Sequence, residues 1–206
     1  MDKPFSQACE NNKQPIADVL KRVFDHSERV FEIGSGTGQH ASWMVSELTH
    51  LQWLPSDCEV NLPGIRLWCE GVNTEQLMPP VVFDVNDSDW PDLHIDAVFS
   101  ANTAHIMPLD AAERMVRRVA LKLPTGGVFA LYGPFNYSGQ FTSESNANFD
   151  QWLKSNNSLQ GIRNFEDINK IATHFGLSLY EDNSMPANNR LLVWVKQAVA
   201  PLKPEQ

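Results

Sequence analysis

Residues 31–38 read Phe31-Glu32-Ile33-Gly34-Ser35-Gly36-Thr37-Gly38, an apolar run that breaks into three closely spaced glycines. Glycine suits such a turn because it has no Cβ, and so permits positive φ angles and the close approach of a ligand. A helical pattern follows to about Leu48, and the first turn of a helix offers N–H groups and positive potential to a ligand. This strand, turn and helix predict an α/β fold with a cofactor site at the turn.

Outward from this unit, apolar runs alternate with helical patterns, which is typical of βαβ units and a parallel sheet. Pro15 is expected in the first turn of the first helix, and Asn61 at the N-cap of the third. The two strands that close the chain predict a seven-stranded, mostly parallel sheet with an antiparallel last strand and helices on both faces. We expect strands at 29–33, 51–55, 81–85, 95–100, 128–132, 177–181 and 191–196, and further helices at 12–25, 39–48, 109–123 and 164–174.

No repeat or linker divides the sequence, so residues 1–206 are expected to form a single domain with flexible ends at 1–10 and 198–206. We expect the polar and aromatic stretch 136–157 to act as a mobile cover. The sequence has no apolar run long enough to span a membrane, and residues 1–10 do not resemble a secretory signal. These features favour a cytoplasmic protein with no membrane partner.

The net charge is −9, and no long block of Lys or Arg occurs. Both features argue against an extended nucleic-acid partner, because phosphates require cationic contacts. A small molecule or a protein side chain is the better expectation for a substrate. Cys9, Cys58 and Cys69 lack the spacing of a zinc site or a disulfide framework, so we expect reduced thiols and no metal.

Two cofactors use a glycine turn at the start of a helix. A dinucleotide places its pyrophosphate there and favours Gly-x-Gly-x-x-Gly, but Gln39 stands where the third glycine would be. S-adenosylmethionine (SAM) has no phosphate and needs acceptors for an ammonium group and for ribose hydroxyls, which suits Glu32 and Asp57. Asp57 lies about 20 residues beyond the turn, the spacing of a ribose-binding acid. Asp84 follows the next strand, where it can meet an adenine amino group. The structural alternatives are a turn residue at Asp57 and a turn cap at Asp84.

The motifs resemble an uncharacterised family of class I SAM-dependent methyltransferase-like proteins that includes methyltransferase-like protein twenty-six. The resemblance covers residues 12–196 and implies a Rossmann-like class I methyltransferase fold, with no particular substrate. Glu10-Asn11-Asn12 departs from related sequences, which often read Glu-Arg-Asn, so the cation expected there is missing. The resemblance is carried by Asn12-Lys13-Gln14-Pro15-Ile16, residues 32–41, Trp53-Leu54-Pro55-Ser56-Asp57, Gly133-Pro134-Phe135, residues 161–167 and Met185-Pro186-Ala187-Asn188-Asn189.

The resemblance also implies which residues bind SAM. Residues beside the glycine turn and at the strand ends complete the expected site, and His40 is expected to orient the loop rather than to react. The residues implied by the resemblance are Glu32, Gly34, Gly36, Gly38, Asp57 and Asp84, and the additional ones are Ser35, Thr37, His40, Val85 and Ser100.

The loops after the fourth and fifth expected strands should carry the residues that meet a methyl acceptor. His105 is a candidate general base because its ordinary pKa lies near neutrality, and Asn102 and Tyr132 are the other catalytic candidates. The catalytic and substrate-binding candidates also have structural alternatives. The histidine can pack at a strand end, the asparagines can stand in turns, the aromatic residues can pack below a loop, and the arginine can form an ion pair on a helix surface. The substrate-binding candidates are Phe135, Asn136, Arg163, Asn188 and Asn189.

Together these observations predict an enzyme that transfers the methyl group of SAM to a small molecule or a protein side chain and releases S-adenosylhomocysteine (SAH). A protein with this fold that binds SAM or a partner without catalysis is the alternative. A nicotinamide or flavin oxidoreductase is less favoured, because the third glycine is missing and the two closing strands do not suit a dehydrogenase.

Overall fold

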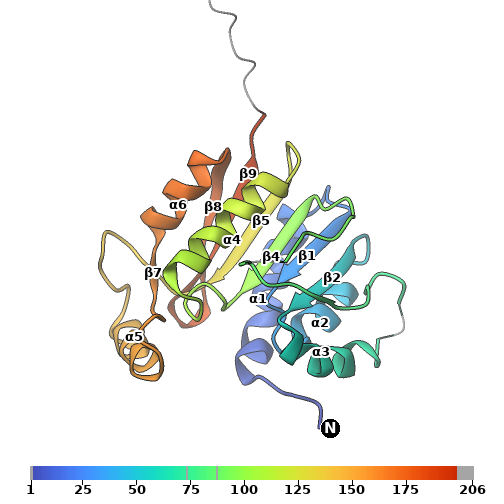
Figure 1. Cartoon of the computed structure of the whole chain (residues 1–206), viewed down its shortest axis with the longest axis horizontal. Helices are drawn as coiled ribbons and strands as arrows, with labels where there is room; N and C mark the ends of the chain where they lie inside the picture. Colours follow the sequence, from blue (N-terminus) through green and yellow to red (C-terminus); the bar gives the residue numbers. More distant parts are fainter. Residues whose placement is uncertain (1, 73, 87, 199–206) are drawn as a thin grey trace, which may run out of the picture.

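The chain folds around a seven-stranded sheet in a computed structural model that describes residues 2–72, 74–86 and 88–198 (Figure 1). The strand order is β3-β2-β1-β4-β5-β9-β8. Strands β1 to β5 pair in parallel, whereas β9 is antiparallel to β5 and to β8. The expected Rossmann-like sheet with an antiparallel last strand is therefore confirmed. The strands are β1 (Arg29–Ile33), β2 (Gln52–Asp57), β3 (Val81–Val82), β4 (Ala97–Ala101), β5 (Val128–Gly133), β8 (Leu177–Met185) and β9 (Asn189–Lys196).

Helices cover both faces of this sheet, because side chains along a strand alternate between the two faces. On one face, Leu20 of α1 and Met44 of α2 join Phe99 of β4 in a buried cluster. On the other face, Val116 of α4 and Ile168 of α6 belong to a second buried cluster. Figure 1 shows α4 and α6 in front of the sheet. Five of the helices are α1 (Gln7–Val23), α2 (Gln39–Glu47), α3 (Leu62–Cys69), α4 (Leu109–Lys122) and α6 (Phe165–His174).

Helix α1 begins earlier than the sequence pattern predicted. Ser6 is its N-cap, and the Ser6 hydroxyl accepts a hydrogen bond from the Cys9 backbone N–H at 3.4 Å. Pro15 consequently lies inside the helix rather than in its first turn, so it cannot donate to the Asn11 carbonyl. The extra turn brings the start of α1 to the carboxyl ends of the strands. Flexibility of residues 1–10 stays a prediction, and residues 199–206 lie outside the described part.

The stretch after β5 contains a helix that was not predicted, α5 (Glu144–Asn156). Its N-cap Ser143 accepts from the Asn146 backbone N–H at 3.1 Å. A two-stranded pair, β6 (Phe135–Asn136) and β7 (Arg163–Asn164), brackets this helix. Asn61 is the N-cap residue of α3, as predicted, and the 3-10 helix η1 (Glu59–Asn61) leads into this helix. The Asn61 side chain makes no cap hydrogen bond, and its amide donates to Asp57.

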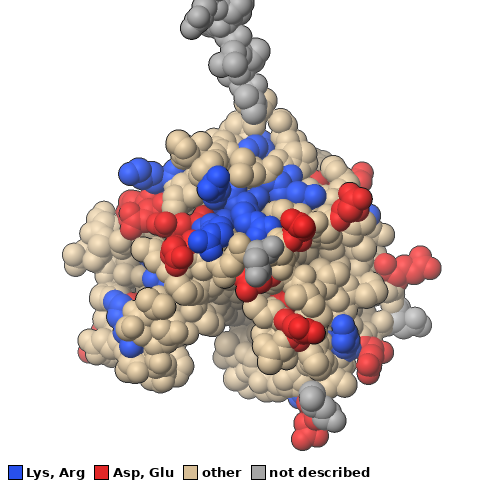
Figure 2. Space-filling view, in the orientation of Figure 1, with Lys and Arg blue, Asp and Glu red and all other residues tan. Residues whose placement is uncertain are grey.

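Charge is unevenly spread over this fold despite its acidic total. Figure 2 shows Lys and Arg side chains gathered over α4, whose sequence carries Arg114, Arg117, Arg118 and Lys122. Arg118 donates to the carbonyls of Val85 and Ser88, so part of this charge holds the segment after β3. Across the described residues, every helix is too short or too polar to pass through a lipid bilayer.

Candidate functional site

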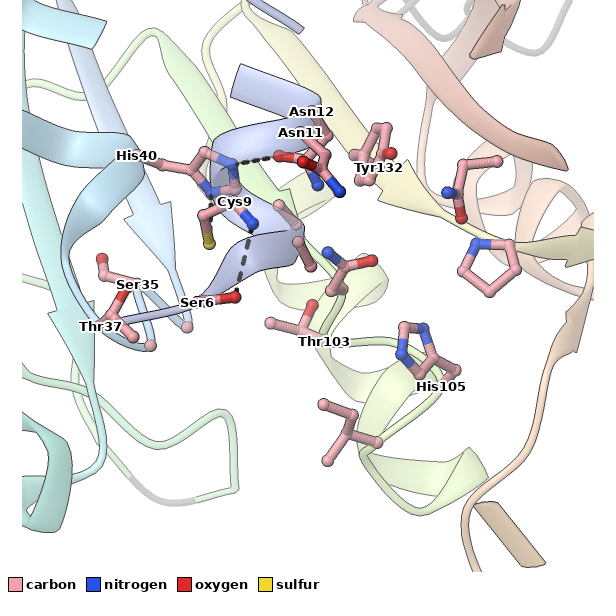
Figure 3. A pocket seen from close by; sticks show the side chains of 18 of the residues that line it. Ser6, Cys9, Asn11, Asn12, Ser35, Thr37, His40, Thr103, His105 and Tyr132 are labelled. Carbon is pink, nitrogen blue, oxygen red and sulfur yellow. Dashed lines mark hydrogen bonds between the residues drawn. The ribbon is translucent and has the colours of Figure 1, made fainter. Parts of the chain in front are cut away.

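A cavity of about 870 Å³ opens at the carboxyl ends of the parallel strands. Its walls are the glycine loop after β1, the end of β2, the loop after β4, the end of β5, the first turns of α1 and α5, and the 3-10 turn η2 (Pro186–Asn188). Figure 2 shows the surface hollowed between α5 and the part of the molecule that holds α2 and α3, and Figure 3 shows the lining from close by. Open α/β sheets bind ligands at this edge.

The glycine loop forms one wall, and two of its glycines have steric reasons to be glycine. Gly34, Gly36 and Gly38 have φ angles of 73°, 59° and 89°. A Cβ on Gly38 would lie 2.9 Å from the Ile65 Cα, and one on Gly34 would lie 2.4 Å from Thr103 Cγ2. The loop therefore packs tightly on α3 and on the loop after β4, while Gly36 faces open space.

Asp57 lies beside this loop and lines the cavity. Its Oδ2 accepts from the Gly36 N–H at 2.7 Å, and its Oδ1 accepts from the Cys58 N–H at 2.7 Å and from Asn61 Nδ2 at 2.8 Å. A carboxylate has about four acceptor positions, so these three bonds fix its orientation and leave capacity for a ligand. Both its spacing from the glycine loop and the family resemblance pointed to this acid, and the structure places it at the end of β2 on the cavity wall.

Glu32 was expected to accept from the ammonium group of SAM, but it does not line the cavity. It is 1% exposed below the loop, where its Oε2 accepts from Ser35 Oγ at 2.8 Å and from Trp53 Nε1 at 3.0 Å. Burial raises the pKa of Glu32 to about 7, although both hydrogen bonds lower it. Glu32 therefore supports the loop from beneath.

Asp84 also lies outside the cavity lining. Its Oδ1 accepts from the backbone N–H and the side-chain amide of Asn86, both at 2.8 Å, so it caps a turn. That turn follows β3, which ends at Val82, earlier than predicted. Two other cofactor candidates are turned elsewhere: Val85 packs in the core, and the Ser100 hydroxyl donates to the Ile33 carbonyl at 2.8 Å. Gly38, packed on α3, is outside the lining as well.

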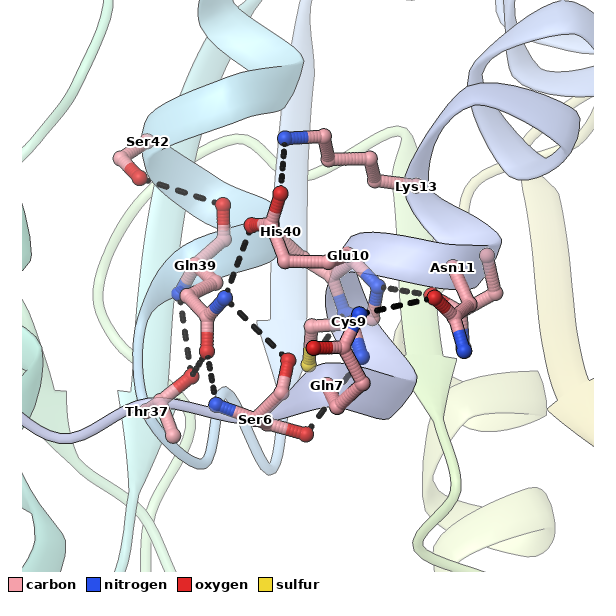
Figure 4. A network of polar contacts seen from close by, with 11 residues as sticks. Ser6, Gln7, Cys9, Glu10, Asn11, Lys13, Thr37, Gln39, His40 and Ser42 are labelled. Atoms are coloured by element: carbon pink, nitrogen blue, oxygen red, sulfur yellow. Dashed lines mark hydrogen bonds and ion pairs between the residues drawn. The ribbon is translucent and has the colours of Figure 1, made fainter.

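The start of α1 is fastened over the loop by Gln39, the residue in place of a third glycine (Figure 4). Gln39 Oε1 accepts from the Ser6 N–H at 2.5 Å, and its Nε2 donates to the Ser6 carbonyl at 3.3 Å and to Glu10 Oε1 at 2.9 Å. Trp68 Nε1 adds a bond to the Pro4 carbonyl at 2.6 Å. This clamp makes the N-terminal segment a wall of the cavity.

His40 lines the cavity, and its ring contacts the start of α1. Its Nε2 lies 2.7 Å from Asn12 Oδ1, which can only accept, so Nε2 carries the proton (Figure 3). Nδ1 is then an acceptor and lies 4.0 Å from Cys9 Sγ. Burial lowers the pKa of His40 to about 4, which keeps the ring neutral at pH 7.

The three catalytic candidates meet in the cavity: Asn102 and His105 after β4, and Tyr132 in β5. Burial and then the Arg163 guanidinium lower the pKa of His105 to about 4. His105 is therefore unprotonated at pH 7 but a weak base. Burial raises the pKa of Tyr132, while hydrogen bonds with Asn12 and Asn189 lower it, so these two asparagines face its hydroxyl.

Among the substrate candidates, Asn189 lines the cavity and the others do not. Arg163 donates from Nε to the Ala104 carbonyl at 3.0 Å and from Nη2 to the carbonyls of Met107 and Leu159, which turns it away. Asn188 donates to Ser145 Oγ at 3.2 Å. Two more are buried in or near the core: Phe135 belongs to a core cluster, and Asn136 lies in β6 with its Oδ1 buried and lacking a hydrogen-bond partner in the described structure.

Two walls of the cavity were not predicted from the sequence, the start of α1 and the start of α5. Ser6 and Ser143 are good N-cap residues before helical patterns, and Phe149, Trp152 and Leu153 recur at helical spacing; both signals were available. The missed lining residues are Ser6, Ala8, Cys9, Asn11, Asn12, Cys58, Asn61, Ala101, Thr103, Ile106, Met107, Ser145, Asn146, Phe149, Pro186 and Ala187.

Backbone strain gathers at the same cavity. Asn102, Ala187 and Asn188 have φ angles of 59°, 57° and 58°, a left-handed conformation that residues other than glycine rarely adopt. Asn102 and Ala187 line the cavity, and Asn188 follows directly. Strain of this kind persists where surrounding structure enforces it, and it clusters at ligand sites.

Solved structures with this architecture include several methyltransferases. An O-methyltransferase family protein from Burkholderia thailandensis matches with a TM-score of 0.77 at 16% identity, over 90% of this chain and 56% of its own. An O-methyltransferase family 2 protein from Planctomyces limnophilus, in complex with apigenin, has a TM-score of 0.80 at 15% identity, over 92% and 58%. PigF with SAH has a TM-score of 0.74 at 16% identity, over 88% and 55%. The chain thus spans little more than half the length of these proteins, and at such identity the likeness shows the fold.

A family model matches residues 3–196, nearly the whole chain. That range contains the glycine loop, Asp57, both walls missed from the sequence and the closing strand pair. Its description is "Protein of unknown function (DUF938)", and this chain belongs to that family.

Proposed function

We propose that this protein is a SAM-dependent methyltransferase. The observation that carries the proposal is the hydrogen bond between Asp57 and Gly36, which joins the acid at the end of β2 to the glycine loop on the cavity wall. The strand order and the methyltransferases that share the fold support it. Kinship with the group that includes methyltransferase-like protein twenty-six stays a prediction from the motifs.

The charges of this wall favour SAM over a dinucleotide. The Asp57 carboxylate occupies the Gly36 N–H, where a pyrophosphate would need an open amide and would meet a like charge. The same carboxylate suits ribose hydroxyls, which donate hydrogen bonds. Ser6 and Asn11, at the start of α1, line the cavity and offer a hydroxyl and an amide to the carboxylate of the methionine part.

The cavity residues suit methyl transfer by alignment. Bound SAM supplies a sulfonium methyl group: a lone pair of the acceptor forms a bond to the methyl carbon, and the carbon–sulfur bond breaks with its electron pair left on sulfur. The walls hold the two reactants together and exclude water, which lowers the barrier. His105 is unprotonated at pH 7, so its ring can take the acceptor's proton or pass it to water.

Calorimetric titration with SAH tests the proposal. Asp57→Ala should weaken SAH binding by about 100-fold, because it removes a charged acceptor and frees the loop. Asp84→Ala is the matched control, since it deletes the same charge outside the cavity, and it should bind within about threefold of the wild type. Absence of SAH binding to the wild-type protein at millimolar concentration would refute the proposal.

A turnover screen with methyl-labelled SAM separates an enzyme from a protein that only binds SAM. In such a screen His105→Asn should lower turnover about tenfold, the modest loss expected for a weak base, with SAH affinity unchanged. A protein that binds SAH yet labels no acceptor in a broad screen would instead be a SAM-binding protein without catalytic activity.

A further inference from the structure

The side of the cavity opposite the glycine loop has its own chemistry. Here the acceptor wall denotes His105, Ile106, Tyr132, Asn146 and Phe149, which come from the loop after β4, from β5 and from α5. The cavity volume of about 870 Å³ lies near the upper end of the range for ligand sites, about 300–1,000 Å³, which leaves room beside one cofactor. The role of this wall rests on the proposed function, because the wall would contact the molecule that lies next to SAM.

The acceptor wall offers nothing to neutralise an anion. Of the described residues that line the cavity, none is Lys or Arg, and the carboxylate of Asp57 lies on the cofactor side. His105 is neutral at pH 7, because its pKa is lowered to about 4. Arg163, whose charge acts on His105, is held outside the lining by backbone carbonyls.

The start of α5 does not reverse this conclusion. A helix N-terminus attracts negative charge, but Glu144 lies in the first turn and supplies a negative charge of its own. The Asn146 backbone N–H is also taken, because it donates to Ser143 Oγ at 3.1 Å. An anionic acceptor would therefore lose its hydration without gaining an opposite charge, which is costly.

Asn146 presents an acceptor atom to the cavity. It is 4% exposed, and its Nδ2 donates to Thr142 Oγ1 at 2.9 Å and to the Asn188 carbonyl at 3.1 Å. A carbonyl oxygen can only accept, so the Asn188 bond fixes which way the amide points. An amide nitrogen has two hydrogens, and both are used. The atom left for a ligand is Oδ1, which requires a hydrogen-bond donor.

Phe149 contributes an aromatic ring to the acceptor wall. Its ring stacks on Trp152 with centroids 5.8 Å apart and planes at 13°, and the His105 ring lies steeply inclined to it, with centroids 5.4 Å apart and planes at 71°. Ile106, 51% exposed, continues the apolar surface at the cavity edge. A flat ligand that lies on a pre-positioned aromatic ring binds about two- to tenfold more tightly than the burial of its area alone would give.

We propose that the acceptor wall selects an uncharged, flat, mainly apolar molecule whose O–H or N–H group donates to Asn146 Oδ1 while its ring lies on Phe149. Shape and apolar surface give binding, the amide oxygen gives orientation, and the lack of a cation excludes carboxylates and phosphates. Phe149 and Asn146 are thus the residues that determine specificity on α5.

Three probes of one shape test each part separately: 2-naphthol, 2-methoxynaphthalene and 2-naphthoate. Binding is measured by ligand-observed NMR at pH 7, with and without saturating SAH. The naphthol, neutral and a donor, should bind; the ether, which has no donor, should bind about tenfold more weakly, since Asn146 Oδ1 is left unpaired. The naphthoate, an anion, should show no binding. Equal binding of all three probes, or binding of none, would overturn the proposal.

Three variants locate the effect. Phe149→Leu should weaken naphthol binding about tenfold, and Gln151→Ala, on the exposed side of α5, should not. Ile106→Arg, at an edge position with room for a long side chain, should admit the naphthoate. SAH affinity should stay unchanged in all three. Unchanged naphthol binding in Phe149→Leu, or continued exclusion of the anion in Ile106→Arg, would refute the assignment. Absence of SAH binding to the wild type would instead refute the proposed function.

Discussion

The three glycines of the loop have different neighbours, so they should respond differently to an added methyl group. Gly38→Ala presses a Cβ against the Ile65 backbone at 2.9 Å and strains a positive φ, so it should lower the free energy of unfolding by about 3 kcal/mol. Gly36→Ala strains φ alone and should cost about 1 kcal/mol. Urea unfolding measures both, and equal losses would show that the packing on α3 is not as described.

Glu32 should make stability depend on pH. Its folded-state pKa of about 7 lies above the ordinary value, so its contribution is fully present below about pH 4.5 and is lost as pH rises through 7. Glu32→Gln cannot ionise. Relative to the wild type, this variant should gain about 3 kcal/mol of unfolding free energy between pH 4.5 and pH 8. Urea unfolding measures this difference between the variant and the wild type. A difference in unfolding free energy that does not change with pH would contradict a buried Glu32 carboxyl with a raised pKa.

His40 and His105 should make stability depend on pH in the opposite direction to Glu32. Their folded-state pKa values of about 4 lie below the ordinary value, so the stability they contribute is present above about pH 6.5 and is lost as pH falls through 4. In the Glu32→Gln background the acid side of the stability curve should remain, because the two imidazoles are still buried. A curve without that acid loss would show that the rings are accessible to water in the folded protein.

Among the helices and strands, local pattern predicted the strand, loop and helix around the glycines because each signal lies within a few residues. Asp57 was predicted because its spacing follows from the βαβ unit. The starts of α1 and α5 were missed because single caps, Ser6 and Ser143, mark them. The wrong assignments of Glu32 and Arg163 have another cause: whether a polar side chain faces a cavity depends on partners distant in sequence, such as Trp53 and the Ala104 carbonyl.

The N-terminal wall depends on one side chain of α2. Gln39→Ala removes the bonds to both backbone groups of Ser6 and to Glu10, so amide exchange at residues 6–10 should accelerate and SAH binding should weaken about tenfold. Gln7→Ala is the matched control, because Gln7 is exposed in the first turn of α1, and it should change neither the amide exchange nor the SAH affinity. Unchanged exchange in Gln39→Ala would show that the wall is held by other contacts.

Over the molecule as a whole, the net charge is negative, but the charged residues are unevenly distributed. Cations gather over α4, while the cavity at the strand ends has no Lys or Arg in its described lining (Figure 2). The net charge can be read from composition but this arrangement cannot, because the fold decides which charges share a surface. The proposal of an acceptor without negative charge follows from this arrangement. The prediction that no extended nucleic acid binds follows from the sequence alone, from its net charge and its lack of a long Lys or Arg block.

SAM binding in the cavity at the carboxyl ends of the strands underlies both proposals, and a crystal structure of the protein grown with SAH tests it. We expect SAH in the cavity, with its ribose hydroxyls on Asp57, its methionine part toward the first turn of α1 and its sulfur facing His105 and Tyr132. SAH bound elsewhere, or a ribose that does not contact Asp57, would contradict this placement.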